Sequence, residues 1–235
     1  PGLNDARSWN DPAADIAGKT VLLYDEQGIG DAIQFARFAD AVRRRGAHPV
    51  LMLRPALAAL FQGLTPTAEI VTLRDAPPAH DLHAALNSLP FLLGVGADVG
   101  MAAPYLAADS ARSAAWREKI GTEGLRVGVA WQGKTTGMGD ADRAFPLAAL
   151  APLAALPGVR LIALQKGEGE EQLAGLPDGM TVETLGADFD AGPDAFLDTA
   201  AAMAALDLVI TCDTAIAHLA GALGRPCWVA LKNVP

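Results

Sequence analysis

Short apolar runs alternate with segments of helical periodicity along the chain from about residue 18 onward. Residues 19–28, KTVLLYDEQG, form an apolar run that ends at glycine, as a buried strand does. In the following segment, 31–46, apolar residues recur at the spacing of one helix face. That face holds Phe35, Phe38, Ala39 and Val42. This alternation predicts right-handed βαβ units and therefore parallel sheets.

The pattern occurs in two series, separated by a polar helical segment at 108–124. We therefore predict two Rossmann-like domains, 1–108 and 109–235, with 1–18 as a lead-in without periodicity. The second series ends on a strand without a closing helix, which predicts a C-terminally truncated second domain. The further expected strands are 49–55, 68–73, 125–133, 159–167, 180–186, 207–213 and 226–231, with a short strand, turn and helix over 80–94. The further expected helices are 56–64, 146–156, 168–176, 194–206 and 214–224.

Composition and charge narrow the function classes. Hydrophobic residues make up 51% of the chain, mainly Ala, Leu and Val, which suits helices packed on a parallel sheet. The formal net charge is −9, and a nucleic-acid-binding protein needs a concentrated basic face. The one basic cluster, Arg43 to Arg45, ends a predicted helix, where cations complement the helix dipole. We therefore expect no nucleic-acid partner.

The cysteines and the apolar runs bear on the compartment. Cys212 and Cys227 lack the CxxC spacing of a zinc site, and we expect them to be reduced and buried. No apolar run reaches the roughly 18 residues of a membrane span, and no signal peptide is visible. These features predict a cytoplasmic protein without a transmembrane segment. The chain begins with Pro rather than Met, so we expect it to be a fragment of a longer protein.

The turn GIGDAI places Gly28, Gly30 and Asp31 between a predicted strand and a predicted helix. Glycines there would permit positive φ and close approach of a ligand. A dinucleotide fingerprint would need a small residue where Ile33 stands, although Arg54 after the next strand leaves an NADP reading open. Asp31 has two readings: a carboxylate that caps the helix, or a general base at the carboxyl edge of the sheet.

The segment CDTAIAH opens the predicted helix at 214–224. Thr214 and His218 are four residues apart and share the face opposite the apolar stripe, beside Asp213 and Ala215. The free N–H groups and dipole of such a helix start suit a diphosphate. The alternative is that Asp213 or Thr214 merely caps the helix and that His218 is a surface histidine. The apolar stripe consists of Ile216, Leu219, Ala220 and Leu223.

Two cations, Arg143 and Lys166, are expected at the same sheet edge as Asp213, where they could neutralise a leaving diphosphate without metal. Each could also be an ordinary solvated side chain. The D-x-D patterns at 140–142 and 188–190 fit a short metal-binding motif of glycosyltransferases. Because the chain is rich in Asp and both patterns stand in loops, we read them as surface loops. No metal and no cofactor are expected.

Together, these motifs resemble the glycosyltransferase family 9 superfamily, which includes the ADP-heptose–lipopolysaccharide heptosyltransferases. The resemblance rests on LLYDEQGIGDAIQFARF, VGVAWQG, DRAFPLAAL, LIALQKG and the DTAIAH segment, in this order. It is strongest to the glycosyltransferase-like domain that follows tetratricopeptide repeats in bacterial proteins. It therefore implies fused repeats upstream as a possible partner.

The resemblance implies a GT-B-like fold, with two Rossmann-like domains facing across a cleft. It implies a metal-independent, inverting transfer of a sugar from a nucleotide-sugar to an acceptor hydroxyl. The first domain would hold the acceptor and the second the donor. Asp31 matches the proposed catalytic base, and Thr214 and Ala215 match the helix start that binds diphosphate. Asp213 and His218 belong to the same motif, and Arg143 stands where a basic residue contacts donor phosphate.

Two other functions stay open at this point. A nucleotide-sugar epimerase can share the architecture, and so can a nucleotide-binding module that has lost catalysis and serves as an interaction partner. The nucleotide base, the sugar and the acceptor, whether glycan, lipid or protein, are not readable from the sequence.

Overall fold

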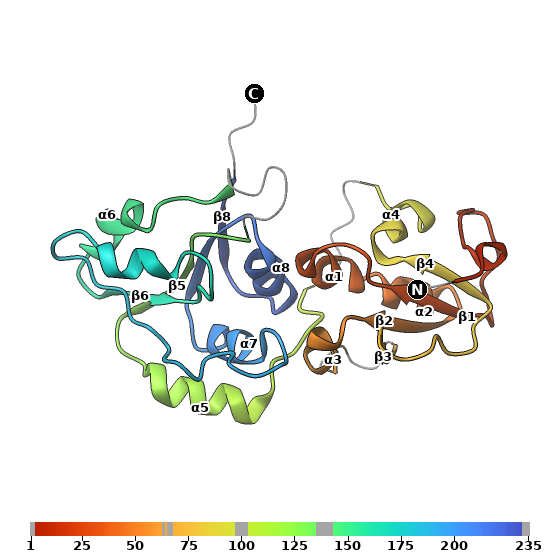
Figure 1. Ribbon diagram of the computed structural model, residues 1–235, viewed down its shortest axis with the longest axis horizontal. Coiled ribbons are helices and arrows are strands. Elements are labelled where there is room, and N and C mark those ends of the chain that lie inside the picture. The colour runs from red at the N-terminus through yellow and green to blue at the C-terminus, as the bar shows by residue number, and fades with distance from the viewer. Residues whose placement is uncertain (1–2, 63, 65–67, 97–102, 135–142, 232–235) are drawn as a thin grey trace. The chain divides into compact units, whose positions relative to one another are not determined.

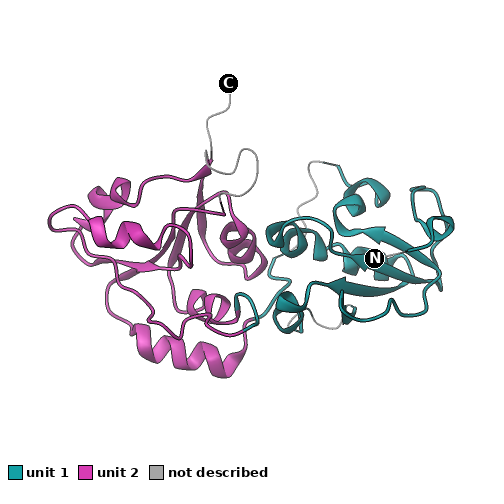
Figure 2. Cartoon of the chain, in the orientation of Figure 1, with its two compact units in different colours: residues 1–107, 193–196 teal, residues 108–192, 197–235 magenta. Residues whose placement is uncertain are grey.

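The computed structural model describes residues 3–62, 64, 68–96, 103–134 and 143–231. Figure 2 shows that the chain forms two compact units. The first contains residues 1–107 together with a short later segment, 193–196, and the second contains residues 108–192 and 197–235. The amide of Ala195 in that short segment donates to the carbonyl of Ala56, 2.7 Å away, within the first unit.

The first unit is built on a parallel sheet of order β3-β2-β1-β4 (Figure 1). This order reverses direction between β1 and β4, as in a Rossmann half-domain. The strands are β1 (Thr20–Tyr24), β2 (His48–Leu53), β3 (Glu69–Thr72) and β4 (Leu82–Ala85). The helices are η1 (Asp5–Arg7), α1 (Ile29–Ala36), α2 (Ala39–Arg44), α3 (Pro55–Phe61), η2 (Leu86–Ser88) and α4 (Leu89–Leu92).

The single helix predicted over 31–46 is in fact two helices, α1 and α2. The amide of Phe38 bonds to the carbonyl of Phe35 at 3.0 Å, three residues back, which tightens the turn between them. This turn buries Phe38, whose ring stacks on Phe35 and lies under the guanidinium of Arg37. Core packing of Phe38 therefore accounts for the break.

The basic cluster at the end of α2 has local partners. Arg43 and Arg44 each lie 2.8 Å from a carboxylate oxygen of Asp40. Arg45 donates to the carbonyls of Leu92 and Leu93, which ties α2 to α4. The lead-in segment is also more structured than expected, because Trp9 is buried and its amide bonds to the carbonyl of His83.

The second unit has a parallel sheet of order β6-β5-β7-β8 (Figure 1). Its helices α5 and α7 lie side by side, joined by bonds from Arg112 and Trp116 to Asp198. The strands are β5 (Leu125–Ala130), β6 (Val159–Ala163), β7 (Leu208–Cys212) and β8 (Cys227–Ala230). The helices are α5 (Ser110–Ile120), η4 (Leu147–Leu150), α6 (Ala151–Ala154), η5 (Glu170–Gly175), α7 (Leu197–Met203) and α8 (Ala215–Ala222).

Three of the predicted elements of this unit are shorter or tighter than expected. The strand expected over 180–186 is reduced to one parallel bridge, between Glu183 and Ile162 of β6. Including this bridge, the sheet follows the same Rossmann order as the first unit. The helix expected over 168–176 is the 3₁₀ helix η5, and that over 146–156 is split into η4 and α6, with Pro152 in the first turn of α6.

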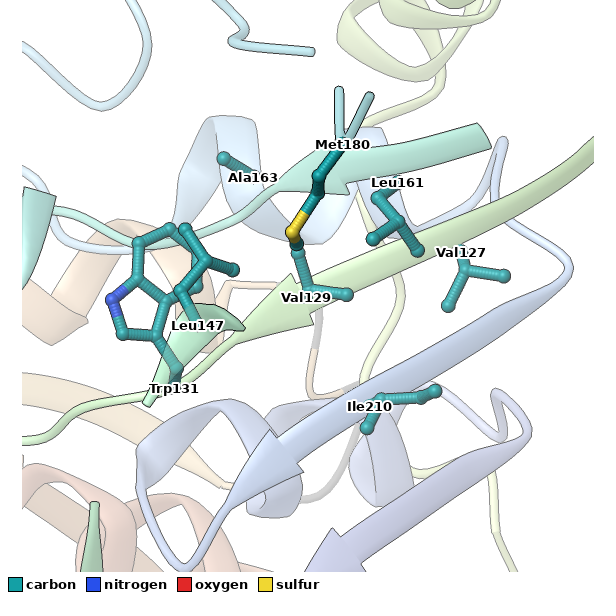
Figure 3. Close-up of a cluster of buried hydrophobic side chains, with 8 residues drawn as sticks. All are labelled: Val127, Val129, Trp131, Leu147, Leu161, Ala163, Met180 and Ile210. Atoms are coloured by element: carbon teal, nitrogen blue, oxygen red, sulfur yellow. The ribbon is translucent and has the colours of Figure 1, made fainter. Parts of the chain in front are cut away.

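The second unit has a continuous apolar core on one face of its sheet (Figure 3). Val127, Val129 and Trp131 project from alternate positions of β5 and just beyond it, as the two-residue period of a strand requires. Strand β8 lies at the edge of this sheet and is less buried than β5, because its Trp228 is 64% exposed.

Both cysteines are free thiols, with Cys212 buried and Cys227 half-buried. No helix within the described residues is long and apolar enough to cross a membrane.

Candidate functional site

A small hollow in the first unit lies at the point where the strand order reverses. It is lined by loop residues that follow β1, by residues of α1, and by Leu86 and Asn87, which follow β4. Its empty volume, counted to the open surface, is ≈ 160 Å³. Open parallel sheets bind ligands at this position, outside the carboxyl ends of two strands whose connections diverge. The lining residues are Asp25, Glu26, Gln27, Asp31, Ala32, Phe35, Leu86 and Asn87.

Asp31 lies in the first turn of α1, two residues after the helix begins at Ile29. Its Oδ2 accepts a hydrogen bond of 2.9 Å from the amide of Gly28, which satisfies one free N–H at the helix start. Asp31 is half-exposed and lines the hollow. The capping reading is therefore correct as a structural role, and it leaves the carboxylate accessible for chemistry.

The glycines of this turn do not adopt the positive φ that they would permit. Gly28 has φ −68° and ψ 162°, extended backbone that any residue adopts, and Gly30 belongs to the first turn of α1. A Cβ at Gly28 would instead lie 3.1 Å from Oδ2 of Asp31. The absence of a side chain at Gly28 thus leaves space for the Asp31 carboxylate.

Arg54, the candidate ligand for a 2′-phosphate in the NADP reading, instead binds Asp25 and the carbonyl of Gln27. Its Nε and Nη2 donate to the two carboxylate oxygens of Asp25, at 2.5 and 2.8 Å, and Nη2 also donates to the carbonyl of Gln27. The Asp25 side chain is buried and that of Arg54 is 30% exposed, so this is a partly buried, bidentate ion pair. The hydrogen bond to Asp25 and the nearby carboxylates raise the pKa of Arg54. Since its fork is occupied, the geometry speaks against the NADP reading.

In the second unit, the strand order reverses between β5 and β7, and helix α8 begins at this point. Thr214 is its N-cap, and Oγ1 of Thr214 accepts from the amide of Ile216 at 3.4 Å. Oγ1 of Thr211, buried at the end of β7, lies 3.3 Å from Oγ1 of Thr214. From the loop after β5, a Cβ at Gly133 would lie 3.0 Å from Cγ2 of Thr214. The two loops thus meet closely beside the first N–H groups of α8.

The helix stripe has the orientation that its periodicity predicted. Ile216, Leu219 and Ala220 are buried, whereas Thr214 and His218 are half-exposed on the other face. Ala215 is the first residue of the helix and is also half-exposed, so nothing larger than a methyl group stands at its start.

The two candidate cations are not placed alike. Nη1 of Arg143 lies 3.7 Å from Oδ2 of Asp213, and both side chains are partly exposed. Arg143 and Asp213 therefore stand beside the start of α8, as expected. Lys166 follows β6, one strand away from the reversal point, and its side chain is exposed.

A buried amide, Gln165, was missed by sequence reasoning. Its Oε1 accepts from the amides of Trp131 and Gln132, at 3.0 and 3.1 Å. Its Nε2 donates to the carbonyls of Gln132 and Glu168, at 2.8 and 2.6 Å. Gln165 thereby fixes the loop after β5, which carries Gly133, to the loop after β6. The pattern LQKG contains this residue, but only the neighbouring Lys166 was predicted as a site residue, because it is charged.

The two D-x-D patterns do not form a metal site within the described residues. The pattern at 140–142 lies outside those residues. The other pattern lies in a turn in which Asp188 is exposed, as predicted, whereas Asp190 is half-buried. Its carboxylate accepts from the amides of Asp198 and Thr199, at 2.8 and 3.3 Å, and from the Thr199 hydroxyl. Burial raises the pKa of Asp190. Its hydrogen bonds to Asp198 and Thr199 join the loop before α7 to the first turn of that helix.

Comparison with known proteins supports the fold. No family model matches the sequence. Protein FlbA of Caulobacter vibrioides is 32% identical over 97% of this chain, and the chain spans 43% of the length of FlbA. Glycosyl transferase family 9 from Veillonella parvula superimposes with a TM-score of 0.68 at 14% identity, over 95% of this chain and 84% of that one.

Two Escherichia coli enzymes have the same fold. ADP-heptose LPS heptosyltransferase II matches with a TM-score of 0.60 at 14% identity, over 89% of this chain and 84% of that one. Heptosyltransferase WaaC, solved with ADP-2-deoxy-2-fluoro heptose, matches with a TM-score of 0.54 at 17% identity, over 89% and 88%. The predicted likeness to glycosyltransferase family 9 is therefore confirmed at the level of the fold, with two Rossmann-like parallel-sheet units. The association with tetratricopeptide repeats stays a prediction.

Proposed function

We propose that this chain is a glycosyltransferase that moves a sugar from a nucleotide-sugar donor to a hydroxyl acceptor. The observation that carries the proposal is the kind of group found at the carboxyl edge of each sheet, where the strand order reverses. At the reversal point of one sheet stands an accessible carboxylate, Asp31. At the reversal point of the other begins α8, with Arg143 beside it. A base and an anion-binding helix start are the two devices that a transfer from a sugar diphosphate requires.

In the proposed reaction, the second unit binds the donor and the first unit binds the acceptor. The first N–H groups of α8, Thr214 and Arg143 hold the diphosphate. Asp31 takes the proton from the acceptor hydroxyl as its oxygen bonds to the anomeric carbon. The bond from that carbon to the diphosphate oxygen breaks, and the electron pair leaves with the nucleoside diphosphate. Attack opposite the leaving group inverts the anomeric centre.

The solved structures of similar fold agree with this class of donor, because WaaC was solved with an ADP-heptose analogue and with ADP. For this chain, the proposal covers a nucleotide-sugar of unspecified base and sugar. It needs no metal, since Arg143 and the helix start supply the positive potential for the leaving group.

The direct test replaces Asp31 by asparagine. The amide keeps an oxygen that can accept from Gly28, so the fold should persist, but it cannot take a proton. We expect transfer, measured as nucleoside diphosphate released in the presence of acceptor, to fall by about 10²–10⁴-fold. A matched control is Asp109→Asn, because Asp109 likewise caps a helix by accepting from Arg112, at 2.7 Å. Equal turnover in wild type and Asp31→Asn would leave Asp31 as a cap only.

A further inference from the structure

One peptide group joins Arg54 to Asp31. The carbonyl of Gln27 accepts a hydrogen bond from Nη2 of Arg54. The N–H on the other side of the same peptide bond belongs to Gly28 and donates to Oδ2 of Asp31, at 2.9 Å. Because a peptide group is planar, fixing its carbonyl oxygen also fixes the direction of its N–H.

The guanidinium itself is held firmly. Nε and Nη2 of Arg54 donate to both oxygens of Asp25, whose carboxylate is buried. The amide of Asp25 in turn bonds to the carbonyl of Met52 at 3.0 Å, at the ends of β1 and β2. Planar, two-pronged pairing leaves little rotational freedom to either side chain. The chain of contacts from Asp25 to Asp31 is thus anchored on the sheet.

The charges along this chain alternate in sign. A cation on the carbonyl oxygen draws electron density from the peptide nitrogen, which makes the Gly28 N–H a stronger donor. The residues that line the hollow around Asp31 include acids but no Lys or Arg. Arg54 therefore supplies positive charge through the Gln27–Gly28 peptide, whereas the residues that line the hollow include no cation.

We propose that Arg54 is a positioning residue for Asp31, acting through the Gln27–Gly28 peptide and held in place by Asp25. The peptide N–H binds Oδ2 and fixes the rotation of the carboxylate, so that Oδ1 is presented as the proton acceptor. This inference rests on the proposed role of Asp31 as general base. It assigns a catalytic purpose to an ion pair with a buried carboxylate, neither member of which contacts the reacting atoms.

The test compares wild type with Arg54→Lys, which keeps the charge but lacks the planar fork that bonds both Asp25 oxygens and the Gln27 carbonyl. We expect kcat to fall by about 10- to 100-fold, since a small misplacement of a reacting group has an effect of this size. KM for the donor should not change. The double variant Asp25→Asn/Arg54→Gln removes both charges together, and so avoids an unpaired buried carboxylate if Arg54→Lys fails to fold.

The matched control is Arg160→Lys in the second unit. Arg160 also pairs with both oxygens of a carboxylate, Glu183, and donates to the carbonyls of Glu123 and Ile120. Loss of kcat in Arg54→Lys with kcat retained in Arg160→Lys supports the proposal. Equal losses in both, or none in Arg54→Lys, would overturn it.

A second readout does not depend on turnover. The proton chemical shift of the Gly28 amide reports the strength of its hydrogen bond, and it should move upfield in Arg54→Lys. An unchanged Gly28 resonance overturns the inference, even if wild type proves to transfer no sugar. Absence of transfer in wild type alone would contradict the proposed function instead.

Discussion

The side chain of Gln165 binds both backbone groups of Gln132, accepting from its N–H at 3.1 Å and donating to its carbonyl at 2.8 Å. Replacing Gln165 by Leu would leave these groups and the Trp131 amide without a partner in a largely buried place. We expect the free energy of unfolding to fall by at least about 1–3 kcal/mol, the penalty for one unpaired buried polar group. Urea unfolding measures this.

Gln62→Leu is a suitable control, because the side chain of Gln62 is exposed at the end of α3. Little change is expected there. If Gln165→Leu proved as stable as wild type, the amide would not be fixing the loop.

Gly28→Ala should impair transfer without unfolding the protein. The backbone at Gly28 suits any residue, but the added Cβ would meet Oδ2 of Asp31 at 3.1 Å and turn the carboxylate. We expect turnover to fall by about tenfold or more, with an unchanged thermal midpoint. Gly175→Ala serves for comparison, since nothing lies within 4 Å of a Cβ there. Full activity of Gly28→Ala would show that the space beside Asp31 is not needed.

Arg143→Ala should weaken binding of a nucleoside diphosphate. A charge-assisted bond to phosphate contributes about 1.5–3 kcal/mol, and partial exposure reduces this, so a loss of about tenfold in affinity is reasonable. Isothermal calorimetry with ADP, UDP and GDP gives the dissociation constants. Arg112→Ala removes a similarly exposed arginine that pairs with Asp198 in the same unit, and this variant should bind the nucleotides normally. Identical constants for Arg143→Ala and wild type would remove Arg143 from the donor site.

The Arg126–Asp207 pair predicts how stability responds to acid. Hydrogen bonds from the Arg126 guanidinium lower the pKa of Asp207. A carboxyl group with a lowered pKa contributes stability above its ordinary pKa of about 4, and that contribution is lost as the pH falls through the folded value. The difference in unfolding free energy between wild type and Asp207→Asn should therefore shrink from pH 7 to pH 3. Urea titrations at both pH values test this, and a constant difference would contradict it.

The architecture was predictable because strand and helix periods alternate so regularly. The apolar stripe of α8 and the carboxyl-edge position of Asp31 and Thr214 both follow from that alternation. Short elements were harder to predict. The strand expected over 180–186 has apolar residues, but only Glu183 pairs with β6, because pairing is decided by neighbours that a local pattern does not contain.

The supporting shell of each candidate site could not be read from the sequence. Arg54 and Asp25 are 29 residues apart, and Gln165 and Gln132 are 33 apart. Such pairs form only because adjacent parallel strands end side by side, so their partnership is a product of topology. A charged or amide residue immediately after a strand is the signal that could have suggested them.

The uneven burial of the tryptophans gives this protein a built-in optical probe. Trp9, Trp116 and Trp131 are 3%, 8% and 0% exposed, whereas Trp228 on the edge strand is 64% exposed. In the native state, an aqueous quencher such as iodide would therefore extinguish emission chiefly from one indole. A partner that covers β8 would therefore reduce the quenching of Trp228 fluorescence by iodide.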